Sequence, residues 1–280
     1  MEKAIKRYFP IFVLPTMIAF TLGFIIPFVE GVYLSFCKFT TVNDAKFIGF
    51  ANYAKVFADE TFVHAFWYTA AFTVVSVILI NVLAFAVALL LTKGFKGTNI
   101  FRTVFFMPNL IGGIVLGYIW QLLLNGILMK FSRTLTYSST YGFWGLIILM
   151  CWQQIGYIMI IYIAGIQNIP GELIEAAEID GATKWQILKK VTIPMVMPSI
   201  TVCTFLTLTN SFKLFDQNLA LTNGEPSKMS EMLALNIFNT FYGRTGYEGV
   251  GQAKAVIFFI LVTVIALTQN YLTRRKEVQQ

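Results

Sequence analysis

Long apolar runs, separated by short polar stretches, dominate this chain. Each of six runs has about 20 residues or more, enough for an α-helix with a rise of about 1.5 Å per residue to cross a hydrocarbon core of about 30 Å. The runs cover approximately residues 11–36, 63–91, 101–124, 142–166, 196–220 and 252–272. The pattern predicts an all-α, polytopic membrane protein with six transmembrane helices, organised as one transmembrane domain over residues 1–280.

Composition strengthens this prediction. Of the 280 residues, 57% are hydrophobic and 12% are charged, which is about half the charged fraction of an average soluble domain. The first run follows Lys3, Lys6 and Arg7, as in a secretory signal peptide. It is longer than the apolar region of such a peptide and shows no small-residue cleavage site, so we expect it to remain as a membrane span.

The distribution of Lys and Arg predicts the orientation of the spans. If the N-terminus lies inside, seven basic residues fall in the outer loops, together with six acids. Twelve fall at the inner ends: Lys3, Lys6, Arg7, Lys93, Lys96, Arg102, Lys184, Lys189, Lys190, Arg274, Arg275 and Lys276. Because inner loops carry an excess of Lys and Arg, this bias predicts that both termini are cytoplasmic. The net charge of +7 then reflects topology and lipid contact rather than nucleic-acid binding.

The chain lacks the residue sets of an intramembrane enzyme. Cys37, Cys151 and Cys203 are scattered, and His64 is the only histidine. These positions suit neither a disulfide framework nor a metal site. No HExxH, GxSxG or Walker motif occurs, so we expect no catalytic residue, no metal and no nucleotide hydrolysis in this chain.

One polar segment, residues 167–195, interrupts the apolar pattern between the fourth and fifth runs. Pro170 and Glu172 fit the first turn of a short helix, where Pro is tolerated and acids complement the helix dipole. Gly181 interrupts that helix, and Thr183 with Gln186 then fits a capping box at the start of a second one. The segment predicts two short helices that meet at an elbow on the cytoplasmic side, parallel to the membrane.

The charges of this elbow leave two interpretations open. The elbow either lies on lipid headgroups or fits into a cleft of another protein. Its first limb carries Glu175, Glu178 and Asp180, and its second limb ends in Lys189 and Lys190. The acids argue mildly against contact with anionic lipid.

The same segment carries a family motif. It reads Glu175-Ala176-Ala177, two further residues, Asp180-Gly181-Ala182 and, after a spacer, Val191-Thr192-Ile193-Pro194. This motif resembles the EAA loop of the permease subunits of binding-protein-dependent ABC importers. Further stretches are similar to the carbohydrate-uptake branch of that family: Phe101-Arg102 with Met107-Pro108, the run from Ala164 to Pro170, and Leu221-Thr222-Asn223-Gly224-Glu225-Pro226. Ser35-Phe36 and the stretch from Ile48 to Tyr53 resemble the MalF-like member of the permease pair. Leu188 departs from the Phe that is usual in the family, and Glu225 stands where Gly is common.

The resemblance implies a type I ABC importer permease fold in the bacterial cytoplasmic membrane. The implied partners are a second homologous permease subunit, two ATPase subunits that bind ATP and Mg, an extracytoplasmic sugar-binding protein, membrane lipid and the sugar substrate. In the family the EAA loop docks on the ATPase, which assigns coupling here to Glu175, Ala176, Ala177, Asp180, Gly181 and Ala182. The chain itself would hold no cofactor and would move a sugar or oligosaccharide by alternating access.

Polar side chains inside the apolar runs are candidates for the substrate path, because a sugar must exchange its hydrogen bonds to water for bonds to protein. The candidates share helical faces in the fourth and fifth runs, or follow Pro108 in the third. They are Asn109, Gln153, Gln154, Tyr157, Thr207, Asn210 and Ser211, and they match positions that line the sugar site in maltose-type permeases. Alternatively, these groups hold helices together through hydrogen bonds worth about 0.6–2 kcal/mol each, or line a path without a defined site.

Two further pairs have more than one interpretation. Lys213 and Asp216, three residues apart in the fifth run, are an expected intramembrane ion pair with either a structural or a gating role. An unpaired charge at the midplane costs about 2.5–3.5 kcal/mol, so a pair or a water-lined position is expected. Gly113 and Gly117 form a GxxxG pattern that allows close helix contact, either within the chain or with the second permease subunit.

Hydropathy alone also fits an ion-coupled secondary transporter of a small polar solute. Such a protein needs ion-coupling acids and two repeated halves, whereas the runs hold few acids, mainly Glu30 and Asp216. Ion coupling also does not require a cytoplasmic elbow of this kind. We therefore predict the permease subunit of an ATP-driven sugar importer; the sugar, the identity of the ATPase and the presence of an outer membrane stay open.

Overall fold

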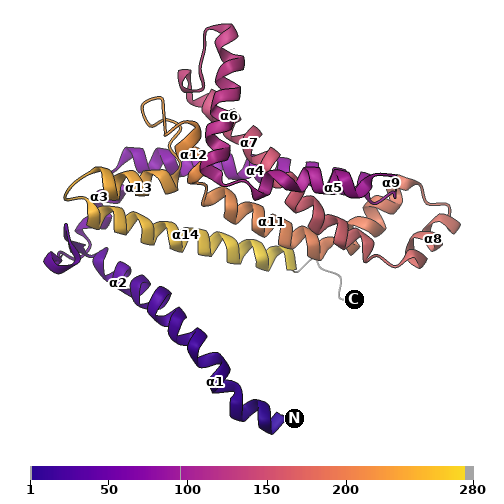
Figure 1. Ribbon diagram of the computed structural model, residues 1–280, viewed down its shortest axis with the longest axis horizontal. Coiled ribbons are helices and arrows are strands. Elements are labelled where there is room, and N and C mark those ends of the chain that lie inside the picture. The colour runs from indigo at the N-terminus through magenta and orange to yellow at the C-terminus, as the bar shows by residue number, and fades with distance from the viewer. Residues whose placement is uncertain (1, 95, 275–280) are drawn as a thin grey trace. The chain divides into compact units, whose positions relative to one another are not determined.

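The computed structural model describes residues 2–94 and 96–274 (Figure 1). Most of these residues are helical, and five helices are long and apolar enough to cross a membrane, or six if one bent pair counts as a single span. The predicted all-α, polytopic architecture is therefore confirmed. The side chains of Lys3, Lys6, Arg7 and Arg274, and the whole of Arg275 and Lys276, lie outside the described part of the chain. The cytoplasmic placement of both termini stays a prediction.

The chain divides into two compact units. The first comprises residues 1–60 and 237–259, and the second comprises residues 61–236 and 260–280. The first unit begins with α1 (Glu2–Phe20), a π-helical turn (Thr21–Ile25) and α2 (Ile26–Leu34). None of the most apolar window within Ile11–Leu34 is buried inside the chain. The surface of this span is therefore available to lipid or to a second subunit.

A short compact segment follows α2. Strand β1 (Cys37–Lys38) pairs antiparallel with β2 (Lys46–Phe47) across a 3-10 turn (Val42–Asp44), and α3 (Ala51–Phe57) comes next. Leu34, Cys37 and Phe39 form its small apolar core. Most of α13 (Leu233–Gly243) and the first half of α14 (Glu248–Arg274) complete the unit.

In the second unit α7 (Ser139–Gln167) is the central helix. Of its most apolar window 61% is buried, compared with 28% for α4 (Glu60–Leu91). The apolar core combines side chains from these two helices and from α11 (Met197–Phe212), among them Phe72, Ile80, Leu146, Ile158 and Cys203. Burial on several sides explains why α7 is apolar around most of its circumference.

Glycines determine the closest helix contacts in this unit. A Cβ on Gly156 of α7 would overlap the carbonyl oxygen of Phe105, so α5 (Thr98–Phe106) packs backbone to backbone against α7. On α6 (Gly113–Leu128), a Cβ on Gly117 would lie 2.7 Å from the Cβ of Ala220 in α12 (Asp216–Leu221). The GxxxG pair therefore packs within the chain.

Two predicted spans are divided in the structure. The third, about 101–124, breaks because α5 ends at Phe106 and a 3-10 turn (Met107–Leu110) precedes α6. Pro108 in that turn has no N–H to continue a helix. The fifth, about 196–220, consists of α11 and α12, separated by three residues that are not helical. The helical segment Lys184–Met195 meets α11 at a bend of 69°, between Pro194 and Pro198.

Candidate functional site

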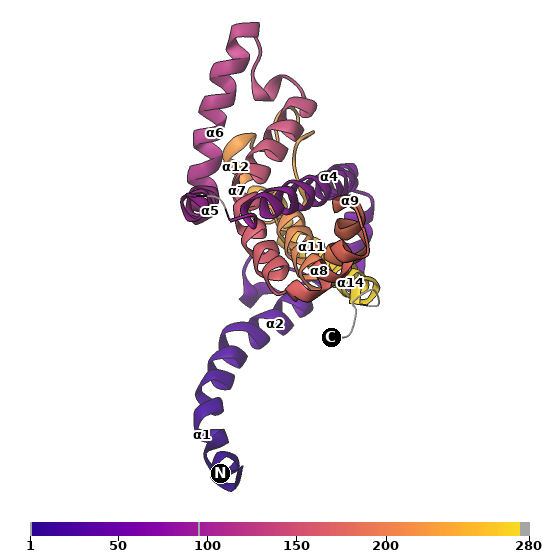
Figure 2. The same ribbon diagram turned by 90° about the vertical axis from the view of Figure 1, so that its right-hand side faces the viewer.

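The predicted helix–elbow–helix is present in the second unit. It consists of α8 (Gly171–Ile179) and α9 (Lys184–Ile187), which face the reader in Figure 2. Pro170 occupies the N-cap position of α8, and Glu172 lies in its first turn. A π-helical turn (Leu188–Thr192) and α10 (Ile193–Met195) then lead into α11.

The backbone of the elbow explains the glycine at position 181. Helix α8 ends in a Schellman motif, in which the N–H of Ala182 donates to the carbonyl of Ala177 at 2.9 Å and the N–H of Gly181 donates to that of Glu178 at 3.0 Å. Gly181 has a φ of +78°, a conformation that costs a residue with a Cβ about 1–2 kcal/mol. Apart from its two neighbours in the chain, no described residue has an atom within 4 Å of a Cβ built on Gly181. The φ angle, rather than packing inside the chain, requires glycine.

The second limb starts with the predicted capping box, which is confirmed. The N–H of Thr183 donates to Oε1 of Gln186 at 2.7 Å, and the N–H of Gln186 donates to Oγ1 of Thr183 at 3.3 Å. These two reciprocal bonds set the direction in which the chain leaves the elbow. The angle between the limbs is therefore determined by local hydrogen bonds.

The outer surface of the elbow is charged and unpaired. Its acids and lysines are exposed, and within the described ranges none of them forms an ion pair: Glu172, Glu175, Glu178, Asp180, Lys184, Lys189 and Lys190. Ile179 and Trp185 add two apolar side chains that are 86% and 69% exposed. Between the limbs lies a hollow of about 310 Å³, lined by Ala177, Asp180, Gly181, Ala182, Gln186, Ile187, Lys190 and Val191. This surface offers charges, apolar groups and a concavity to a partner.

A second hollow, of about 280 Å³, lies where α7 faces the end of α11. It brings together Gln154 and Asn210, two of the substrate-path candidates, with Lys213 and Asp216. The remaining lining residues are Met150, Leu214, Phe215 and Gln217. Gln154 is 8% exposed, and its Oε1 has no hydrogen-bond partner among the described residues. The hollow supplies both donors and acceptors, as a polyhydroxylated ligand requires.

Two further candidates form hydrogen bonds with neighbouring helices. Oε1 of Gln153 accepts from Nε2 of Gln217 at 2.8 Å. Thr207 is fully buried, and its Oγ1 accepts from Nδ2 of Asn81 at 2.9 Å, while Oδ1 of Asn81 accepts from the hydroxyl of Tyr162 at 2.7 Å. For Thr207 the geometry favours the helix-packing interpretation over contact with a substrate.

The last three candidates do not line the hollow. Asn109 is half-buried in the turn after Pro108. Tyr157 is half-buried and packs against the apolar core of the unit. Ser211 is fully buried, and its Oγ has no partner among the described residues. The structure thus gathers only part of the predicted ring around one space.

Lys213 and Asp216 do not form the expected ion pair in the described part of the chain. Helix α11 ends at Phe212, so the spacing of three residues does not place the two side chains on one helical face. Both side chains are exposed and line the 280 Å³ hollow instead. The alternative, a water-lined position for both charges, fits this geometry.

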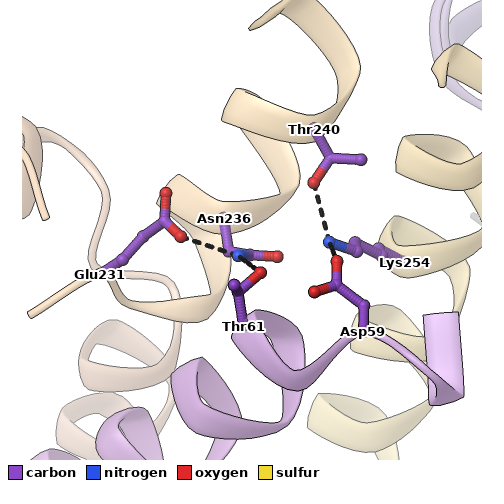
Figure 3. A network of polar contacts seen from close by, with 6 residues as sticks. All are labelled: Asp59, Thr61, Glu231, Asn236, Thr240 and Lys254. Atoms are coloured by element: carbon purple, nitrogen blue, oxygen red, sulfur yellow. Dashed lines mark hydrogen bonds and ion pairs between the residues drawn. The ribbon is translucent and has the colours of Figure 1, made fainter. Parts of the chain in front are cut away.

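Sequence reasoning missed several polar residues that the structure buries. In the first unit Lys254 is fully buried and bonds Asp59 and Thr240 (Figure 3). In the second unit Glu231 is 1% exposed and accepts a hydrogen bond from Nδ2 of Asn236 at 2.7 Å. The available signal in the sequence was the position of Lys254 itself, a charged residue near the start of the sixth apolar run.

The helices of membrane-spanning length and the exposed polar elbow indicate an integral membrane protein with a surface for a partner. The profile of the family described as "Binding-protein-dependent transport system inner membrane component" matches residues 80–278. The chain belongs to this family. It is a permease subunit of a binding-protein-dependent importer. This family membership does not favour the alternative of an ion-coupled secondary transporter.

Relatives extend the similarity over nearly the whole chain. The probable starch degradation products transport system permease protein AmyD of Thermoanaerobacterium thermosulfurigenes is 42% identical, over 96% of this chain and 94% of that protein. The multiple sugar-binding transport system permease protein MsmF of Streptococcus mutans is 28% identical over 99% of each. The trehalose/maltose transport system permease protein MalF of Thermococcus litoralis is 27% identical, over 89% of this chain and 88% of that one.

Solved structures share the fold. A bacterial ABC transporter involved in the import of the acidic polysaccharide alginate contains a chain that superposes with a TM-score of 0.83 at 23% identity, covering 98% of both chains. The same kind of transporter in complex with an alginate pentasaccharide-bound periplasmic protein gives a TM-score of 0.82 at 21% identity. The fold is therefore that of a type I ABC importer permease, as the sequence predicts.

Proposed function

We propose that this chain is the membrane subunit through which an ATP-driven importer passes a sugar or oligosaccharide delivered by an extracytoplasmic binding protein. The names of the relatives support a sugar: they mention starch degradation products, multiple sugars, and trehalose with maltose. The hollow beside α7 supports it as well, because amide and charged groups line a space of about 280 Å³. We assign the substrate contacts to Gln154 and Asn210, with Asn109, Gln153, Tyr157 and Ser211 as further residues of the path.

The elbow carries the proposed coupling to ATP hydrolysis. It presents exposed charges that no group in the described chain neutralises, on a turn whose angle is set by a positive φ. In this proposal Glu175 and Asp180 meet basic groups of an ATPase, and the small Ala176, Ala177 and Ala182 allow its backbone to approach. Gly181 keeps the two limbs at the angle that turns ATPase closure into movement of α7 and α11.

The remaining partners follow from this arrangement. Two ATPase subunits bind ATP and Mg, since this chain carries no nucleotide-binding motif. A second homologous permease subunit completes the translocation path. The excess of Lys and Arg at the inner ends of the apolar runs supports a cytoplasmic location of both termini.

The Gly181→Asp variant tests the coupling proposal. A Cβ at φ +78° changes the angle of the elbow, so we expect loss of uptake, with continued ATP hydrolysis that no longer responds to substrate and with the protein still inserted in the membrane. Gly171→Asp is the matched control, because Gly171 is also exposed and has free space around it but no positive φ. Unaltered transport in Gly181→Asp, or an equal loss in both variants, contradicts the role of the angle.

A separate experiment tests the sugar. The chain is co-purified with its second permease and candidate ATPases, and ATPase activity is measured with the binding protein, empty or loaded with a starch-derived oligosaccharide. We expect stimulation by the loaded form. Equal activity with both forms, in an intact complex, counts against a sugar importer of this kind.

A further inference from the structure

A cluster of aromatic rings lies directly after the first span. The ring of Phe36 is at its centre, with centroid distances of 6.4 Å to Phe47, 5.3 Å to Phe50 and 5.1 Å to Tyr53. We call these four residues the aromatic shelf. Phe47 and Phe50 are 66% and 74% exposed, so the shelf presents large apolar side chains outside the core of its unit.

Hydrogen bonds hold the base of the shelf in place. The buried Asn52 donates from Nδ2 to the carbonyl oxygens of Ser35 at 2.9 Å and of Cys37 at 2.8 Å. The hydroxyls of Ser35 and Tyr53 lie 2.7 Å apart. The rings are therefore presented by a fixed scaffold.

Helix α3 continues the apolar surface. Asn52 and Val56 are buried on one side of the helix. Phe50, Tyr53 and Phe57 follow the spacing i, i+3, i+7 on another side, and Phe57 is 69% exposed. A contiguous exposed apolar patch of this kind marks a site of interaction with a membrane or a partner.

The length of the first span places this patch relative to the membrane. Ile11–Leu34 has 24 residues, or about 36 Å of helix at about 1.5 Å per residue, against a hydrocarbon core of about 30 Å. A helix of this length can cross the core with some tilt. Phe36 follows the last residue of the span by two positions, so the shelf lies next to the end of the span.

Two exposed lysines lie in the β1–β2 pair beside the shelf. Lys38 and Lys46 lie directly opposite each other in the β1–β2 pair, and like charges in this position repel. Within the described ranges neither forms an ion pair. The nearby Asp44 carboxylate accepts the backbone N–H groups of Thr40 and Thr41, which hold the pKa of Asp44 below its ordinary value. Attraction by Lys46 makes a smaller contribution to the lowered pKa of Asp44. Both lysines are exposed and can also reach anionic phosphates.

We propose that the aromatic shelf and Phe57 insert into the headgroup region of the membrane surface at which the first span ends, with Lys38 and Lys46 on the lipid phosphates. Rings of this type at the boundary between headgroups and acyl chains are the apolar half of an interfacial anchor, and lysines are the polar half. Such an anchor fixes the height of the first span, whose most apolar window has no residue buried inside the chain.

Fluorine NMR tests the insertion. 4-Fluoro-phenylalanine, which differs from Phe by one fluorine atom, is placed in turn at Phe47 and Phe50 of the full-length chain in its transporter complex, in phospholipid nanodiscs. The buried Phe39, 6% exposed, is the matched control. Signal loss is compared for lipids with a nitroxide at the headgroup, lipids with a nitroxide at the acyl end, and a soluble gadolinium chelate.

We expect the signals at Phe47 and Phe50 to lose most of their intensity with the headgroup nitroxide and less with either other agent, while Phe39 changes little. Loss mainly with the soluble chelate places the shelf in water and overturns the proposal. Protection from all three agents in the complex, lost when the chain is isolated, assigns the shelf to a protein partner and also overturns it. In a Lys38→Gln/Lys46→Gln variant the headgroup effect is expected to weaken; an unchanged effect removes the lysines from the anchor.

Discussion

Nζ of Lys254 lies 2.7 Å from Oδ2 of Asp59, although 195 residues separate the two in the chain (Figure 3). Lys254 is fully buried and also donates to Oγ1 of Thr240 at 2.8 Å. The Asp59 side chain is 19% exposed. This ion pair joins α14 to the segment before α4 within the first unit.

Removing only the acid should destabilise the protein strongly, because the buried ammonium of Lys254 keeps its desolvation cost and loses its counter-charge. For Asp59→Leu we expect a loss on the order of 3 kcal/mol, measured as a lower melting temperature of the purified chain in detergent. The Lys254→Met/Asp59→Leu double variant should recover much of that loss. Thr240→Val is the control: it removes one hydrogen bond to the ammonium but keeps the Asp59 counter-charge, with an expected loss of about 1.5 kcal/mol. A melting temperature in Asp59→Leu equal to that of the parent contradicts the buried pair.

Gly156→Ala should prevent the close packing of α5 on α7. A Cβ there overlaps the backbone oxygen of Phe105, and backbone atoms cannot rotate away as a side chain does, so the two helices must separate. We expect little monodisperse protein in size-exclusion chromatography. Gly126→Ala is the matched control, because outside its own helix a Cβ on Gly126 meets no atom of the described residues within 4 Å. Normal yield of Gly156→Ala would show that the helices do not approach in this way.

Removing polar groups from the 280 Å³ hollow should have a different effect from removing the hydroxyl of Thr207, which is hydrogen-bonded to Asn81. Gln154→Leu and Asn210→Leu remove hydrogen-bonding groups that line the hollow, so we expect slower sugar uptake with an unchanged melting temperature. Thr207→Val breaks the bond with Asn81, so we expect a small loss of stability, about 0.6–2 kcal/mol, and near-normal uptake. The opposite pattern would move the substrate path away from the hollow.

Lys213 and Asp216 should act independently of each other. Since no ion pair joins them, the effects of Lys213→Met and Asp216→Asn on uptake should add in the double variant, with a coupling energy near zero. Residues in direct ionic contact typically show coupling of about 0.5–3 kcal/mol. A coupling in that range would indicate that the two charges meet during transport.

The sequence predicts features that depend on neighbours along the chain. The six apolar runs follow from side-chain transfer into lipid, and the elbow follows from bonds between residues a few positions apart: the cap formed by Thr183 and Gln186, and the turn that needs glycine at 181. The break at Met107–Leu110 also had a local signal in Pro108. The break after Phe212 had no local signal in the sequence. The apolar pattern predicted a helix that continues through Lys213.

By itself, then, the sequence determined a helical, polytopic membrane protein, the number of apolar runs and the shape of the elbow, because hydropathy and short-range hydrogen bonds act locally. Only the tertiary structure decided which polar groups meet. Lys254 pairs with Asp59, and the backbone of Phe105 packs against Gly156. Gln154 and Asn210 line the same hollow, whereas Thr207 is hydrogen-bonded to Asn81. These contacts depend on how each helix is rotated about its axis and packed against helices that are distant in the chain, and no local pattern contains that information.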